Sequence, residues 1–227
     1  MAGGSITLRG ALDPSALLAI WAAGIAAGAA LVSGWNIVGP GYTWLSAGVA
    51  LLFGVPAAFG AGTAWAGVAL VVAAGLLARR PRLAAIAAAG GALAFLAAAA
   101  LEEWPVLAVT GALFLGGVTT EMMLGHWYLV DPRLPRSALR TLAVIGGVGA
   151  VVDGSATSMM GAVPWPAADA VMGWAFLVLA VTTAILMTAV WLALRERGYA
   201  AVMAATGLSY LALLTAIGAA ALGRALI

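Results

Sequence analysis

The stretch ADAVMGWAFLVLAVTTAILMTAVWLALRER, residues 168–197, decides the fold class of this chain. Between Ala170 and Leu194 it contains no charged side chain, and arginines follow at positions 195 and 197. A helix rises about 1.5 Å per residue, so about 20 apolar residues cross the hydrocarbon core of a bilayer. The stretch is therefore typical of a transmembrane helix that ends at a charged membrane surface.

The composition of the whole chain indicates the same class. Of its 227 residues, 65% are hydrophobic and 8% are charged, whereas roughly 25% of the residues in a soluble domain are charged. So few charges could not cover a water-soluble fold, which excludes a soluble enzyme, a nucleic-acid-binding protein and a disordered chain. The chain has no cysteine and no lysine, so we expect no thiolate metal site, no disulfide and no Schiff base.

Further apolar runs, bounded by proline, glycine and charge, predict the other helices. The first span is expected at about Ser15–Val32. The apolar run 41–78 would be about 57 Å long as one helix, so we expect a break between Pro56 and Gly62, which gives two short spans or a re-entrant half-helix and one full span. The remaining spans are predicted at about 83–101, 105–130, 137–152, 168–194 and 199–222. The sequence thus predicts a single, all-α, polytopic membrane domain over residues 1–227, with seven or eight spans and no soluble domain.

The placement of arginine predicts how these helices are oriented. Arginines cluster in three connections, at residues 79–82, 133–140 and 195–197, and two predicted spans separate each connection from the next. All three should therefore lie on one side of the membrane, which the positive-inside rule identifies as the cytoplasm. We expect a bacterial-type inner membrane with the C-terminus outside, whereas the side of the N-terminus depends on the number of spans. No internal repeat is evident in the sequence.

The segment TTEMMLGHWYLVDP, residues 119–132, carries polar side chains that suit a functional site. Glu121 lies about 14 Å inside the membrane if the helix leaves it near Val130. An ionised, unpaired carboxylate at that depth costs about 2.5–3.5 kcal/mol, so such a residue is by default a candidate functional group. We expect proton, quinone or ligand chemistry at Glu121; the alternative is a protonated carboxyl that only links two helices.

His126, Trp127 and Tyr128 follow near the cytoplasmic end of the same predicted helix. His126 and Glu121 are placed about 140° apart around the helix, on different faces, although they could still line two sides of a cavity. His126 could bind a quinone, relay protons or rest at the interface; haem is disfavoured because no second histidine exists as an axial ligand. Trp127 and Tyr128 are typical of an interfacial aromatic belt, and with His126 they would also suit a quinone ring.

Asp153 opens a second polar segment, DGSATSMM, residues 153–160. We expect Asp153 at the outer end of its span, where it starts a solvated loop; the alternative is that it continues a proton path outward from Glu121. With one histidine and no cysteine, the sequence predicts no metal site and no covalent cofactor. Motifs for nucleotide binding or nucleophilic catalysis are absent from it.

These features favour an integral membrane subunit of a larger electron-transfer or energy-transducing complex, not catalytic on its own, which handles quinone or protons through the Glu121 and His126 region. Its expected partners are membrane lipids and other membrane subunits or further copies of the chain, with no nucleic acid. The alternative is a small proton-coupled transporter in which Glu121 changes its protonation as access alternates between the two sides. An intramembrane enzyme acting on lipid is disfavoured, because the sequence offers only isolated acids and one histidine.

Overall fold

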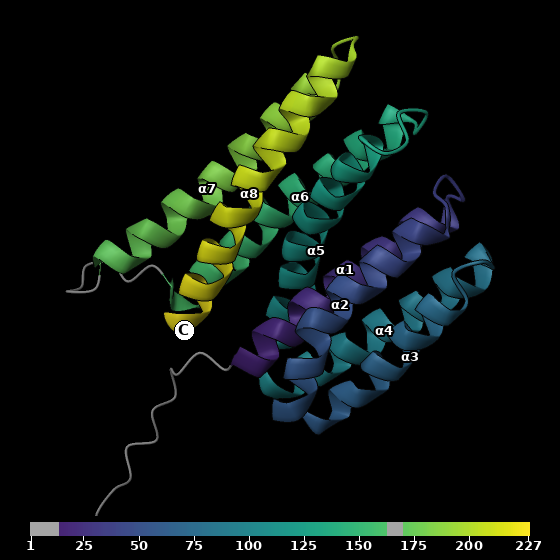
Figure 1. The fold of residues 1–227 in the computed structure, drawn as a ribbon. Helices are drawn as coiled ribbons and strands as arrows, with labels where there is room; N and C mark the ends of the chain where they lie inside the picture. The colour runs from purple at the N-terminus through teal and green to yellow at the C-terminus, as the bar shows by residue number, and fades with distance from the viewer. Residues whose placement is uncertain (1–13, 163–169) are drawn as a thin grey trace, which may run out of the picture.

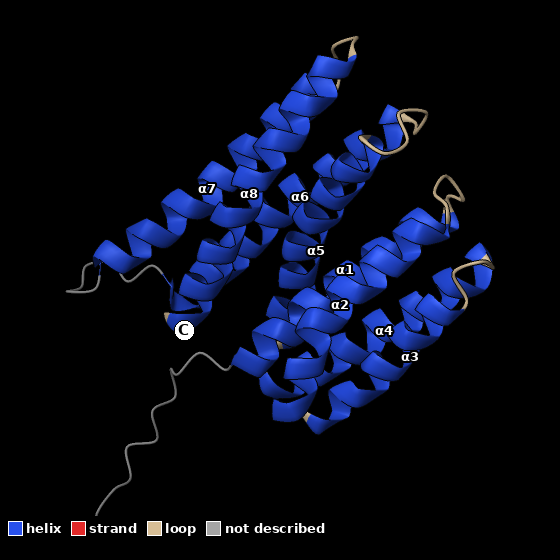
Figure 2. Ribbon diagram, viewed as in Figure 1, coloured by secondary structure: helices blue, strands red, loops and turns tan. Residues whose placement is uncertain are grey.

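The computed structural model describes residues 14–162 and 170–227, and every regular element in these ranges is a helix (Figures 1 and 2). Seven helices are long and apolar enough to cross a membrane, and α3 is shorter. The predicted all-α, multi-pass architecture is therefore confirmed. The elements are α1 Pro14–Gly34, α2 Pro40–Gly60, η1 Gly62–Ala64, α3 Trp65–Leu76, α4 Pro81–Glu102, α5 Pro105–Tyr128, α6 Arg136–Thr157, η2 Ser158–Ala162, α7 Ala170–Ala193 and α8 Tyr199–Ala225.

The long apolar run at residues 41–78 breaks at the far end of the predicted window. α2 continues through Pro56 to Gly60, and Ala61 then adopts an extended backbone that ends the helix. A proline inside a membrane helix is tolerated because neighbouring helices and local adjustments satisfy the freed carbonyl group. α2 is therefore a full-length span and α3, with 12 residues, is the short one, so the run contains one full span and one short helix, with the full span first.

The helices form two groups of four that share one arrangement. In the first group, each of α1 to α4 contacts the next helix, and α4 closes the ring against α1. Helices α5 to α8 form a second ring of the same kind, which α8 closes against α5. Because successive helices alternate in direction, corresponding helices of the two groups run the same way (Figure 1). The fold thus consists of two parallel structural repeats whose shared feature is the packing order of the helices.

Small residues join the two repeats where α1 packs on α5. A β-carbon at Gly24 of α1 would overlap the backbone of Ala112 and Gly116 on α5, so these helices touch main chain to main chain. On the other side of α5, a β-carbon at Gly117 would lie 2.7 Å from the backbone nitrogen of Gly146 on α6. Such close crossings are the usual way in which membrane helices associate, because small residues let the backbones approach.

The connections gather at the two ends of the bundle. The arginine-bearing connections that follow α3, α5 and α7 lie at one end, together with the connection between α1 and α2 (Figure 1). We call this the arginine end. The C-terminus and the connection between α4 and α5 lie at the opposite end, which we call the C-terminal end. The predicted start of the sixth apolar run at Ala168 lies outside the described residues.

Candidate functional site

Glu121 lies on α5, about 10 Å from the arginine end of that helix. It is deeply buried because α5 contacts helices of both repeats and is the most buried of the seven long helices. Only 1% of Glu121 is exposed, and neither carboxyl oxygen has a hydrogen-bond partner among the residues that the structure describes. A buried polar group left without a partner costs free energy, so this position requires an explanation beyond packing.

Two hydroxyl-bearing side chains from two other helices lie near the Glu121 carboxyl. Tyr42, at the start of α2, is fully buried and lies near Glu121. Ser209 of α8 faces the carboxyl, but its hydroxyl bonds to backbone oxygens of its own helix. The adjacent Thr120 is buried, and within the described ranges its Oγ1 has no partner, nor has the Tyr42 hydroxyl. Glu121 therefore lies at a junction to which the first repeat contributes Tyr42 and the second contributes Ser209.

The structure does not combine His126 and Glu121 into one site. His126 is exposed on the outside of the bundle, whereas Glu121 points into it. The Nδ1 atom of His126 lies 3.2 Å from the hydroxyl of Tyr210 on α8, a pair that ties two helices of the second repeat at the surface. The two residues therefore lie on different faces, as their spacing predicts, and they do not line a common cavity.

Trp127 and Tyr128 turn inward and do not form an exposed belt. Trp127 is half-buried and lies edge-on to Tyr42, with the ring centroids 6.0 Å apart. Only 6% of Tyr128 is exposed. The contact between Trp127 and Tyr42 joins the end of α5 to the start of α2. It therefore closes the arginine end of the junction next to Glu121.

Asp153 lies inside α6, so the expectation that it starts a solvated loop is wrong. Only 1% of it is exposed, and its carboxylate accepts hydrogen bonds from Arg224 at 3.0 and 3.1 Å and from Thr110 at 2.6 Å. The glycine and hydroxyl residues that follow Asp153 are typical of loops. Here the hydroxyls of Ser155 and Ser158 donate to carbonyls one turn earlier, which satisfies them within the helix.

Arg224 joins Asp153 and Glu103 into a buried group of charges, which we call the charge cluster. Arg224 lies near the end of α8, is 7% exposed, and also donates to the backbone oxygen of Leu107 at 2.9 Å. Its Nε lies 3.1 Å from Oε1 of Glu103, the residue that caps α4. Burial raises the pKa of the Glu103 carboxyl; Arg224 opposes this shift and Asp153 adds to it.

The charge cluster and Glu121 lie on the same face of α5. Thr110, which bonds to Asp153, precedes Glu121 by 11 positions, close to three helical turns or about 16 Å. Phe114 occupies the same face between them and is fully buried. An apolar layer therefore separates the two polar sites. The buried residues of α8 across this layer, between Ser209 and Arg224, are all small: Ala212, Ala216, Ala219, Ala220 and Gly223.

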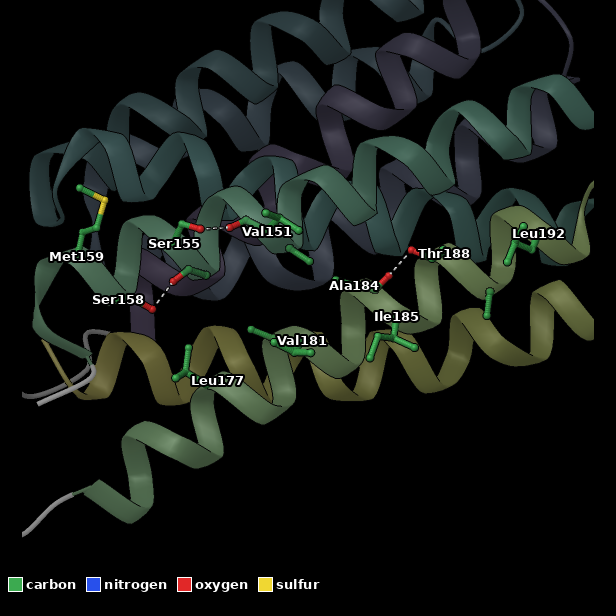
Figure 3. A pocket seen from close by; sticks show the side chains of 14 residues that line it. Val151, Ser155, Ser158, Met159, Leu177, Val181, Ala184, Ile185, Thr188 and Leu192 are labelled. Atoms are coloured by element: carbon green, nitrogen blue, oxygen red, sulfur yellow. Dashed lines mark hydrogen bonds between the residues drawn. The ribbon is translucent and has the colours of Figure 1, made fainter. Parts of the chain in front are cut away.

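A groove of about 810 Å³ lies between α6 and α7 (Figure 3). Its lining is almost entirely apolar, and no charged residue lines it. The hydroxyls of Ser155, Ser158 and Thr188 in its wall donate to backbone oxygens of their own helices. The groove thus has apolar walls and no free polar anchor, as expected of a surface that lipid chains contact.

A smaller groove of about 320 Å³ follows the contact of α1 with α5 and α6, and we call it the seam groove. Its walls are glycines and apolar side chains, and Thr120 is the one polar residue that lines it. Thr120 points toward Gly28 of α1, so the seam groove and the Glu121 carboxyl lie on neighbouring faces of α5.

Five residues of these sites were not predicted from the sequence: Arg224, Glu103, Tyr42, Ser209 and Thr110. Arg224 did give a signal, because an arginine at the outer end of an apolar span departs from the positive-inside rule and needs a partner. Glu103 is one of two adjacent acids in a predicted outer connection, and only folding shows which of them is buried. Tyr42 gave no signal, since a tyrosine at a helix start is typical of an interfacial anchor.

No family model, no curated protein and no solved structure matches this chain. Within residues 14–162 and 170–227, no group of three or more histidine, cysteine, aspartate or glutamate residues could hold a metal ion. The function is therefore inferred from the geometry of the Glu121 site and the charge cluster.

Proposed function

We propose that this chain is a small proton-coupled membrane transporter in which Glu121 carries the proton. The observation that carries the proposal is the buried carboxyl of Glu121, which has no hydrogen-bond partner among the described residues and lies between the two repeats. Ionising a carboxyl inside a membrane protein is costly, so the proton leaves only when the group meets water. Opening of the junction toward one end and then the other would move a proton across the membrane.

The two-repeat architecture supports this proposal. In many transporters, parallel repeats are related by an axis along the membrane normal, and the binding site lies between them. Here α5 of the second repeat packs on α1 of the first, and Glu121 faces side chains from both repeats. The apolar layer around Phe114 separates Glu121 from the charge cluster, as a transporter closed to the C-terminal end requires.

We infer that the transported solute is small and uncharged. The seam groove, on the face of α5 next to that of Glu121, has no charged lining residue, and its polar group is the Thr120 hydroxyl, which has no partner in the described part of the chain. That hydroxyl would bind a solute through one hydrogen bond. A volume of about 320 Å³ is near the lower limit of small-molecule sites, which is roughly 300 Å³.

A second candidate function is that of a quinone-binding subunit in an electron-transfer or energy-transducing complex. The observation that favours it is the exposed His126, whose Nδ1 is held by Tyr210 while Nε2 could donate to a quinone carbonyl from the lipid. The redox centres would then lie on other chains. Native mass spectrometry after gentle extraction distinguishes the two candidate functions. Bound quinone and redox subunits favour the complex, and protein that carries neither favours the transporter.

We place the protein in an inner membrane, with the arginine end in the cytoplasm and the C-terminus outside. The support is the location of the three arginine clusters at one end of the bundle, together with the positive-inside rule. Membrane lipids would cover the apolar outer faces, including the groove between α6 and α7.

Proton-driven currents in proteoliposomes on a solid-supported membrane test the proposed transport. A step in proton concentration, applied with a panel of small uncharged solutes, should give currents in the wild-type protein. Glu121→Gln should reduce these currents by at least about tenfold, because an amide cannot release a proton. Glu102→Gln makes the same change at an exposed carboxyl and should leave them unchanged. Wild-type currents no larger than those of empty liposomes, for every solute, would contradict the proposal.

A further inference from the structure

We propose that the charge cluster is a latch that closes the C-terminal end of the transport path and opens when Glu103 takes up a proton. The latch rests on the proposed transport function, for which it would control access from the outside. The C-terminal end must open for Glu121 to exchange its proton there, and the charge cluster lies between that end and the apolar layer around Phe114.

The latch connects the two repeats. Arg224 and Asp153 belong to α8 and α6 of the second repeat, whereas Glu103 caps α4, the last helix of the first. α4 and α8 occupy corresponding places in the two rings, and both end at the C-terminal end. Among the described residues, the contact between Arg224 and Glu103 is the ion pair that links one repeat to the other.

Arg224 also blocks the seam at this end. A β-carbon on Gly111 of α5 would overlap the guanidinium group of Arg224 and lie 3.0 Å from Ile20 of α1. The guanidinium therefore fills the space between α1 and α5, and Ile20 is fully buried beside it. Water entering from the C-terminal end reaches the apolar layer and Glu121 only when Arg224 and Ile20 move apart.

Glu103 is the member of the cluster that can respond to the outside pH. Its side chain is 12% exposed, whereas those of Arg224 and Asp153 are 5% and 1% exposed. Three hydrogen bonds hold the Asp153 carboxylate, but a single ion pair holds Glu103. Because burial raises its pKa, Glu103 takes up a proton at milder acidity than an exposed glutamate.

The groups around Glu103 determine which contacts are lost when its carboxyl is protonated. The charged groups that act on it are Arg224 of α8 and Asp153 of α6, and α5 contributes the uncharged Thr110 hydroxyl and a backbone carbonyl to the same cluster. Its neighbour Glu102 on α4 is exposed to the outside. A neutral Glu103 no longer attracts Arg224, which stays paired with Asp153 and moves with the second repeat away from Ile20 of α1. The link between the repeats is lost while the buried charges remain compensated.

A single buried cysteine can report whether the latch is open. The chain has no native cysteine, so Ile20→Cys introduces one thiol beside Arg224. Its reaction with a membrane-impermeant maleimide is measured in nanodiscs at neutral and acidic pH. Each rate is divided by that of the same protein denatured at the same pH, which removes the direct effect of pH on the thiol. If Ile20→Cys does not fold, Ala108→Cys on α5 provides a second fully buried reporter.

We expect protection of the thiol at neutral pH and labelling at least about fivefold faster in acid. Glu103→Gln should make labelling fast at both pH values, because its amide mimics the protonated carboxyl. Glu102→Gln, the matched control, should behave like its parent. Labelling that does not change with pH, or protection in Glu103→Gln, would overturn the latch.

This measurement separates the latch from the transport function, because labelling requires no solute and no current. If labelling depends on pH but the protein gives no proton-driven currents, the transport function is contradicted. The seam between the repeats would then still open in acid. Currents that depend on Glu121, together with labelling that ignores pH, would contradict the latch alone.

Discussion

At the scale of single residues, the environment of Glu121 could be predicted from the sequence and that of Asp153 could not. The position of Glu121 in an apolar span predicts burial, and it is buried, because depth in a helix follows from counting residues. The environment of Asp153 could not be predicted in this way. Its partner Arg224 lies 71 positions away along the chain, and their pairing exists only after α6 and α8 have packed.

The pairing of Asp153 with Arg224 leads to a stability prediction. Asp153→Asn removes the charge that accepts two hydrogen bonds from a buried guanidinium, and we expect the free energy of unfolding to fall by roughly 3 kcal/mol. Adding Arg224→Gln removes the buried cation that Asp153 no longer balances and should recover much of this loss. Unfolding in detergent, followed by circular dichroism, measures both variants. A double variant that is less stable by the sum of the single losses would contradict the pairing.

At the scale of the helices, the apolar runs predict where helices exist and predict their ends less well. α2, α4 and α5 each begin at or next to a proline, which is favourable in the first helical turn and could be read from the sequence. α6 runs past its predicted end at Val152, because its serine hydroxyls bond within the helix. Helix ends of this kind depend on local hydrogen bonds that composition does not reveal.

The contact between α1 and α5 leads to a prediction about glycine. Gly24→Ala would place a methyl group against the backbone of α5, where no flexible side chain can move aside. We expect a loss of about 1–3 kcal/mol in the free energy of unfolding. Gly207→Ala on α8, which meets open space, should change it by no more than about 1 kcal/mol. The same detergent unfolding assay compares the two, and equal effects would show that α1 and α5 do not touch as described.

At the scale of the whole molecule, the repeat of two four-helix rings was not evident from the sequence. The repeated property is which helix packs on which, and small residues at 24 and 116 allow the contact without a shared motif. Arginine clusters, in contrast, are local in sequence, so their gathering at one end could be predicted by counting spans.

The alternation of the helices predicts the accessibility of each connection. In a chain without cysteine, Arg80→Cys and Arg197→Cys should be protected from an impermeant thiol reagent in intact cells and labelled after permeabilisation. Glu102→Cys, at the opposite end, should be labelled in intact cells. This pattern requires α3 to cross the membrane despite its 12 residues. Labelling of Arg80→Cys in intact cells, with Arg197→Cys protected, would show that it does not.

Hydrogen–deuterium exchange at the Glu121 carboxyl most directly tests whether this residue carries protons. The C=O stretching band of the protonated carboxyl, identified by its loss in Glu121→Gln, is followed by infrared spectroscopy after transfer of proteoliposomes into D₂O. If the junction opens during transport, the band should shift within seconds, about as fast as domain motions of a working transporter. A band that keeps its position for hours, in protein whose exposed amides have exchanged, would show that Glu121 is a permanently buried link between helices.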